Sequence, residues 1–136
     1  MGAGIIIARQ SVAGWEVLAL QATNQVSLAN GGGLDIPKGR QDLGESNWQC
    51  AVRETYEETS IQITDEDIIS GPFSMDWLTV WLAETSGQDP IFFPNPETGD
   101  FEHEGFSWIP FSEMEQYCYP YLRPYLEWAH NCIKGL

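Results

Sequence analysis

The sequence contains few basic residues. Among 136 residues there are 6 Lys and Arg against 20 Asp and Glu, and the formal net charge is -14 at pH 7. A chain with this charge repels nucleic-acid backbones and anionic membrane surfaces, so we expect neither as a partner. Any polyanionic small molecule that it binds would need metal ions at the binding site.

Cysteine is also scarce, and there is no long apolar run. The three Cys are odd in number and form no C-x-x-C pair, which predicts reduced thiols and no disulfide framework or zinc site. The apolar run near residue 5 is too short to span a membrane and follows no basic segment, so we expect a cytoplasmic protein. With 43% apolar residues the chain can form one core, and we expect a single domain over residues 1–136.

Hydrophobic periodicity and turn residues divide the chain into alternating elements. A hairpin is predicted from two strands, the first apolar enough to be buried on both faces, and a Gly-rich turn is predicted at 30–33. The predicted strands are 3–9, 15–21, 61–69, 77–83 and 102–109. The predicted helices start at the N-cap Ser46, at 111 and at 123, and 86–100 is a long loop. This order predicts an α/β fold with a mixed sheet between helices.

Three glutamates of the first predicted helix stand at positions i, i+3 and i+4, and therefore share one face: Glu54, Glu57 and Glu58. Like charges at this spacing repel by a few tenths of a kcal/mol per pair, and the end of a helix favours cations. A sequence that breaks two local rules at one place indicates a function, although a solvated surface is the common reading of such a cluster. A divalent cation would turn both penalties into attraction, and Mg²⁺ prefers oxygen ligands.

Basic residues concentrate beside these carboxylates. Three of the six fall here, namely Lys38, Arg40 and Arg53. Lys38 and Arg40 flank a turn at Gly39, where their side chains could meet phosphate oxygens. Metal ions at the carboxylates would neutralise phosphate charge and activate water, and a carboxylate not fully held by metal could take the proton. The residues alone do not separate metal ligand from base.

The pattern G-x5-E-x7-R-E-x-x-E-E-x-x-I over residues 39–61 resembles the Nudix box, the signature of Nudix hydrolases. These enzymes split substrates that consist of a nucleoside diphosphate linked to another group. The resemblance implies a Nudix-type α/β/α sandwich and a pyrophosphohydrolase that uses Mg²⁺, with Mn²⁺ as the alternative. It also implies metal binding by Glu54, Glu57, Glu58 and the carbonyl of Gly39. Arg53 and Glu45 would then support the site.

Two positions depart from the Nudix box. Thr55 stands where the family has an aliphatic residue, and Ser60 stands where it has Gly just past the helix. The second change costs about 1 kcal/mol if Ser60 keeps a left-handed conformation. Neither change removes a metal ligand, so we expect activity to survive.

Stretches outside the box suggest the substrate. Residues 36–39, 79–84 and 102–108 are similar to those of asymmetrically cleaving diadenosine tetraphosphate hydrolases, which implies hydrolysis to ATP and AMP by water attack on phosphorus. The resemblance implies that Glu102 reaches the metals from a loop and joins the catalytic set with Arg53 and the box glutamates. It also implies that Phe106 holds an adenine ring. His103 is a further candidate for contact with phosphate or base.

Several alternatives remain open. Residues 102–108 also resemble RNA 5′-pyrophosphohydrolases, although the acidic charge argues against a nucleic-acid partner. ADP-ribose or a dinucleotide coenzyme would suit the same box. A Nudix-fold nucleotide sensor is the main alternative to an enzyme, but such a module normally loses box glutamates. We expect a monomer or a homodimer.

Overall fold

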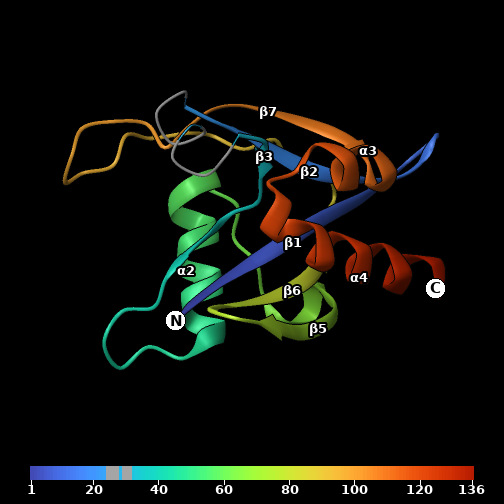
Figure 1. Cartoon of the computed structure of the whole chain (residues 1–136), viewed down its shortest axis with the longest axis horizontal. Coiled ribbons are helices and arrows are strands. Elements are labelled where there is room, and N and C mark those ends of the chain that lie inside the picture. Colours follow the sequence, from blue (N-terminus) through green and yellow to red (C-terminus); the bar gives the residue numbers. More distant parts are fainter. Residues whose placement is uncertain (24–27, 29–31) are drawn as a thin grey trace.

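Strand β1 (Gly2–Ser11) is the centre of the computed structural model, which describes residues 1–23, 28 and 32–136. Residues 2–8 are buried, as predicted for a strand that is covered on both faces. The strand pairs antiparallel with β2 (Gly14–Ala22) and parallel with β6 (Leu78–Glu84), so the sheet is mixed (Figure 1). The predicted hairpin and the predicted mixed sheet are confirmed.

The other strands extend the sheet on both sides of β1. The main order is β3-β2-β1-β6-β5, with β3 at Leu34–Asp35 and β5 at Ile68–Met75. Off this path, β4 (Lys38–Arg40) pairs with β1, and β7 (His103–Pro110) pairs with β2. The pairing of β4 with β1 fixes the start of the Nudix-box pattern on the central strand.

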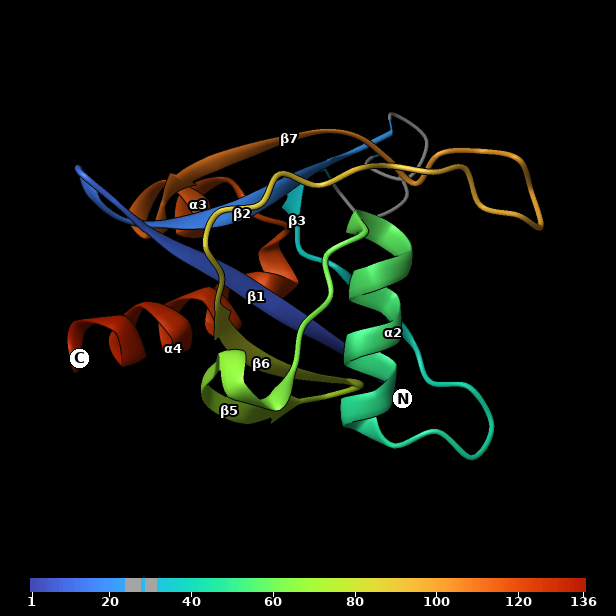
Figure 2. The same ribbon diagram turned by 180° about the vertical axis from the view of Figure 1, so that it is seen from behind.

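Alternate residues of β1 enter two separate cores. Ile5 and Ile7 pack with helix α2 (Asn47–Thr59), whereas Ile6 packs with residues of α3 (Phe111–Tyr117) and α4 (Arg123–Lys134). Helices α2 and α4 lie on opposite sides of β1 in both views (Figures 1 and 2). The arrangement is the predicted α/β/α sandwich.

Helix α2 has defined caps at both ends. The Ser46 hydroxyl accepts from the Gln49 amide at 3.1 Å, and the Gln49 side chain accepts from the Ser46 amide at 2.9 Å, which forms a capping box. At the other end Ser60 has φ 63° and ψ 13°, the left-handed conformation that Gly normally occupies. The Ser60 hydroxyl also donates to the Ile91 carbonyl at 2.9 Å.

The predicted strand at 61–69 is wrong over most of its length. Only Ile68 and Ile69 belong to a strand, and Asp65–Asp67 forms the 3₁₀ turn η1. Ile61 and Ile63 are buried in the core beneath α2, so their alternation reflects packing against the helix and not sheet pairing.

Strands β4 and most of β5 were not predicted. A second 3₁₀ turn, η2 (Pro120–Leu122), leads into α4.

Part of the predicted Gly-rich turn, residues 30 and 31, lies outside the described residues. Gly32 and Gly33 do have positive φ, at 78° and 134°. Across the described ranges, none of the helices has the length and apolar character needed to cross a membrane.

Replacing Ser60 tests the cost of its left-handed conformation. Ser60→Ala and Ser60→Gly both remove the hydroxyl that bonds Ile91, but only Ala keeps the strain of a Cβ at positive φ. We therefore expect the Gly variant to be more stable than the Ala variant by about 1 kcal/mol in urea unfolding. Equal stability of the two variants would contradict a strained cap.

Candidate active site

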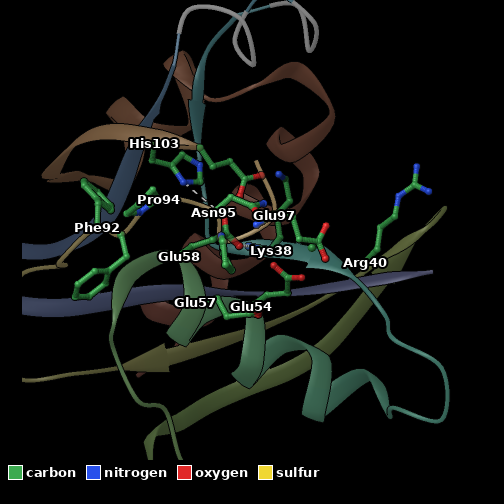
Figure 3. Close-up of a pocket in the computed structure, with 14 residues that line it drawn as sticks. Lys38, Arg40, Glu54, Glu57, Glu58, Phe92, Pro94, Asn95, Glu97 and His103 are labelled. Carbon is green, nitrogen blue, oxygen red and sulfur yellow. Dashed lines mark hydrogen bonds and ion pairs between the residues drawn. The ribbon is translucent and has the colours of Figure 1, made fainter. Parts of the chain in front are cut away.

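The last turns of α2, strand β4 and the loop before β7 enclose one cavity of about 620 Å³ (Figure 3). Most of the residues singled out from the sequence line it: Lys38, Gly39, Arg40, Glu54, Glu57, Glu58, Glu102 and His103. The predicted convergence of the glutamates from one helix face is therefore confirmed. The remaining lining comes from the loop, at residues 92–97, which the sequence indicated only as a long loop.

Arg53 lies behind the cavity wall and holds the carboxylates in place. Its Nε and Nη2 donate to the two oxygens of Glu45 at 2.6 and 3.0 Å, while Nη1 donates to Glu54 at 3.0 Å and to Glu57 at 2.9 Å. Nη2 also donates to the Arg40 carbonyl at 2.9 Å. One guanidinium thus connects β4, the following loop and α2, and the supporting role of Arg53 and Glu45 stays a prediction.

The ion pair between Arg53 and Glu45 shifts the pKa of both groups. The hydrogen bonds from Arg53 lower the pKa of Glu45 to about 2, although partial burial opposes the shift. The hydrogen bond to Glu45 in turn raises the pKa of Arg53 above its ordinary value. Both groups therefore remain charged across the pH range in which proteins are stable.

Gly39 is the point at which β4 meets the glutamate helix. A Cβ at this position would overlap the Glu54 carboxylate, so only glycine allows this close approach. The Gly39 carbonyl accepts a weak hydrogen bond from the Cys50 thiol at 3.5 Å. Burial raises the pKa of Cys50 to about 11, which keeps that thiol protonated as a donor.

Burial raises the pKa of two glutamates of the cavity. Glu58 is 8% exposed, and its burial, together with the charge of nearby Glu102, raises its pKa well above the ordinary value. Burial also raises the pKa of Glu54, although Arg53 opposes this shift. Glu57 is the exposed member of the trio. Carboxylates that face one another in this way fit a divalent cation, because a cation would offset the repulsion that burial intensifies.

Lys38 and Arg40 differ in where they direct their charge. The Lys38 ammonium lies 3.2 Å from Asp35, and its backbone N–H donates to Glu58 at 3.0 Å. The Arg40 side chain extends away from the carboxylates at the edge of the cavity (Figure 3). Both residues line the cavity, but Lys38 is already partnered, whereas the Arg40 side chain has no ion-pair partner among the described residues.

His103 occupies the floor of the cavity beside Glu58. It is 2% exposed, with Nε2 3.1 Å from Asp35 and Nδ1 3.6 Å from Glu58. A bulge in the pairing of β2 with β7, where Ala22 pairs with His103 and Gln21 with Gly105, adjusts the start of β7. The role of Asp35 was not predicted, and its only sequence signal is the i, i+3 spacing to Lys38.

The Asp35 carboxylate is ionised between these two partners. Burial alone would raise its pKa, but the hydrogen bond from His103 and the positive charge of Lys38 lower it on balance. The side chain therefore acts as an acceptor for both neighbours.

The cavity is lined by two aromatic residues that the sequence analysis did not single out. Phe106 is 37% exposed and is not among the residues that line the cavity, but it contacts Phe92 with ring centroids 6.3 Å apart. Phe92 and Phe93 do line the cavity, and Phe93 is 66% exposed. The adjacent pair of phenylalanines in the predicted loop was the available signal.

The loop that carries Phe92 and Phe93 is fastened to the end of α2. The Ile91 amide donates to the Thr59 carbonyl at 2.9 Å, and the Ile91 carbonyl accepts from Ser60. Further along the sheet, the Trp108 indole donates to Asp89 at 3.0 Å. Ser60, which stands where the Nudix box has Gly, therefore holds the loop that closes one side of the cavity.

Comparison with known families identifies this arrangement. The NUDIX domain family matches residues 1–129. The chain belongs to the NUDIX family. It is a Nudix hydrolase, and the pyrophosphohydrolase activity predicted from the box agrees with its relatives.

Two relatives and one solved structure between them carry two different substrate classes in their names. The asymmetrical bis(5′-nucleosyl)-tetraphosphatase of Caenorhabditis elegans is 31% identical over 115 residues, which cover 78% of this chain and 75% of the relative. The RNA pyrophosphohydrolase of Bradyrhizobium sp. (strain ORS 278) is 29% identical over 117 residues, which cover 68% of this chain and 67% of the relative. The crystal structure of a C. elegans Ap4A hydrolase binary complex superposes with a TM-score of 0.68 at 25% identity, covering 99% of this chain and 98% of that one.

The Glu45–Arg53 pair predicts a pH-dependent stability difference. Because the pKa of Glu45 is lowered, the pair stabilises the fold fully above the ordinary value near 4.5 and progressively less as pH falls towards 2. We expect Glu45→Gln to destabilise the protein by about 1 kcal/mol at pH 7 and to have little effect near pH 2. Thermal unfolding of both proteins across this range measures the difference, and a pH-independent effect would contradict the pairing.

Proposed function

We propose that the protein hydrolyses dinucleoside polyphosphates, with diadenosine tetraphosphate split into ATP and AMP, in a reaction that depends on Mg²⁺. The observation that carries this proposal is the gathering of Glu54, Glu57, Glu58 and Glu102 around one cavity. Similarity to the C. elegans tetraphosphatase supports the substrate. A phenylalanine pair at the same cavity supports a ligand with a purine base.

The cavity residues fit a divalent cation. The four carboxylates could supply oxygen ligands, and Gly39 of β4 lines the same space. When bound, such ions offset phosphate charge and lower the pKa of an attacking water. Mn²⁺ accepts the same ligands and is the expected replacement.

Residues of the protein position the reacting groups. Arg53 holds Glu54 and Glu57 at 3.0 and 2.9 Å, so these carboxylates face the cavity in a fixed geometry. A carboxylate of the cavity takes the proton of the attacking water, and the candidates are the three box glutamates and Glu102. Arg40 stands at the rim, where a polyphosphate chain would leave the metal ligands.

The aromatic loop provides a surface for a base. Phe92 and Phe93 project from the loop that Ser60 fastens, and Phe106 lies against Phe92 from β7. Stacking on an aromatic ring contributes about 1–3 kcal/mol per base. We therefore propose that Phe93, the most exposed of the three, contacts adenine and that Phe106 supports Phe92.

RNA 5′-triphosphate is the second candidate substrate, because a relative at 29% identity is an RNA pyrophosphohydrolase. The charge of this chain weighs against it. With a net charge of -14, the chain repels the long phosphate backbone that follows the reacting end of an RNA, whereas a dinucleoside polyphosphate has no such backbone. ADP-ribose and dinucleotide coenzymes remain further comparisons for assay.

Removal of single box carboxylates tests the metal assignment. Glu57→Gln and Glu58→Gln keep the side-chain shape but lose the charge, so we expect turnover to fall by about 10²-fold or more while the fold is retained. Glu127→Gln, an exposed residue of α4, is the matched control and should leave turnover unchanged. Unaltered turnover in both box variants would exclude metal binding by these residues.

A substrate panel distinguishes the candidate functions. The protein is incubated with Mg²⁺ and diadenosine polyphosphates, ADP-ribose, a dinucleotide coenzyme or 5′-triphosphorylated RNA, and products are separated by chromatography. We expect the highest kcat/KM for diadenosine tetraphosphate, with ATP and AMP as products. Preferred release of pyrophosphate from RNA would overturn the substrate, and saturable binding without hydrolysis would indicate a sensor.

A further inference from the structure

Two buried acceptors face one another at the floor of the cavity. The Oε1 atom of Glu58 and the Nδ1 atom of His103 are shielded from solvent, and neither has a hydrogen-bond partner among the described residues. They lie 3.6 Å apart, and the His103 side chain is 1% exposed (Figure 3). Buried polar atoms are normally paired, so an unpaired couple needs an explanation.

The partner of His103 decides which of its nitrogens faces Glu58. The Asp35 carboxylate lies 3.1 Å from Nε2 and 3.2 Å from the Lys38 ammonium. Because a carboxylate only accepts, Nε2 carries the proton that it donates to Asp35. In the neutral ring Nδ1 then presents a lone pair towards Glu58, and two lone pairs at this distance repel unless a proton or a metal ion lies between them.

The spacing suits a metal ion. Bonds of about 2.1 Å place two ligand atoms about 3.4 Å apart around a tetrahedral ion and about 3.0 Å apart as octahedral neighbours. Glu102 offers a third atom, and the ligand atoms of all three residues lie within 4.8 Å of one another. A histidine that donates its other ring N–H to a carboxylate is the usual arrangement at metal sites.

We propose that His103 is a nitrogen ligand, through Nδ1, to a divalent cation that Glu58 and Glu102 also bind, and that Asp35 positions its ring. This inference rests on the proposed function, since the cation is one that the hydrolysis would use. It assigns His103 to the metal instead of to the substrate contact expected from the sequence.

An imidazole ligand changes which ions the site prefers. Mg²⁺ keeps to oxygen ligands and dehydrates reluctantly, whereas Mn²⁺ also favours oxygen but accepts an imidazole nitrogen more readily, and Co²⁺ and Zn²⁺ do so more readily still. The position bounded by His103 should therefore bind Mn²⁺ more tightly than Mg²⁺. Positions held by Glu54 and Glu57 alone should not show this preference.

Pulsed electron paramagnetic resonance of bound Mn²⁺ tests the ligand directly. The untagged protein is prepared with ¹⁵N only in histidine, and the chain contains two histidines, His103 and His130. His130 lies in α4 with its Nδ1 2.8 Å from Glu115, so His130→Gln is the matched control. His103→Gln keeps a donor for Asp35 and removes the Nδ1 position.

We expect ¹⁵N coupling to Mn²⁺ in the unaltered protein and in His130→Gln, and its loss in His103→Gln. Asp35→Asn, which weakens the acceptor without changing its shape, should lower Mn²⁺ affinity about 10-fold and leave Mg²⁺ affinity nearly unchanged. Circular dichroism verifies that each variant is folded.

The outcomes separate this site from the proposed function. Hydrolysis with bound Mn²⁺ but no ¹⁵N coupling in the unaltered protein would overturn the nitrogen ligand alone. It would also indicate that a proton shared by Glu58 and His103 fills the gap. Coupling without hydrolysis of any panel substrate would support the ligand and overturn the function. Absence of both Mn²⁺ binding and hydrolysis would overturn both.

Discussion

Repulsion between carboxylates at the cavity is the interaction on which the rest of the site depends. Glu54, Glu57 and Glu58 share one end of α2, where the helix dipole offers them no relief. Within the described residues, the Arg53 guanidinium forms ion pairs with Glu54 and Glu57, and it also binds Glu45. Glu58 forms no ion pair with Arg53 and is buried, so a negative charge on Glu58 is the least compensated of the three. A bound cation would provide that balance, so the same carboxylates would affect both the stability of the fold and metal binding.

The fold places these charges by close contact between backbone and side chain. Gly39 lies on β4, which pairs with the buried strand β1, and its missing Cβ leaves room for the Glu54 carboxylate. On the opposite side Ser60 ends α2 and binds the loop of Phe92 and Phe93. Because β4 pairs with β1 on one side and Ser60 is bonded to Ile91 on the other, the end of α2 is held at two points beside its carboxylates. The site therefore maintains its charge density by geometry at some cost in local stability.

Local sequence rules predicted the structure correctly where the placing of the residues depended on a single helix or strand. The spacing of the three glutamates placed them correctly on one face, and the continuous apolar run of β1 indicated a strand buried on both sides. The same rules failed where tertiary packing determined the local structure. Ile61 and Ile63 alternate because they fill the core under α2, and no local signal distinguishes this from a strand. The contact of Asp35 with His103 joins residues 68 positions apart, so it depends on the pairing of β7 with β2.

The polar floor of the cavity connects the two halves of the site. Asp35 links Lys38 of β4 to His103 of β7, and the Lys38 backbone reaches Glu58 of α2. The ammonium of Lys38 is therefore occupied in holding Asp35, and Arg40 is the other basic residue that lines the cavity. A chain with so few cations can handle an anionic substrate only if metal ions supply most of the positive charge. Binding of metal ions in the cavity would thus explain both the scarcity of basic residues and the density of carboxylates.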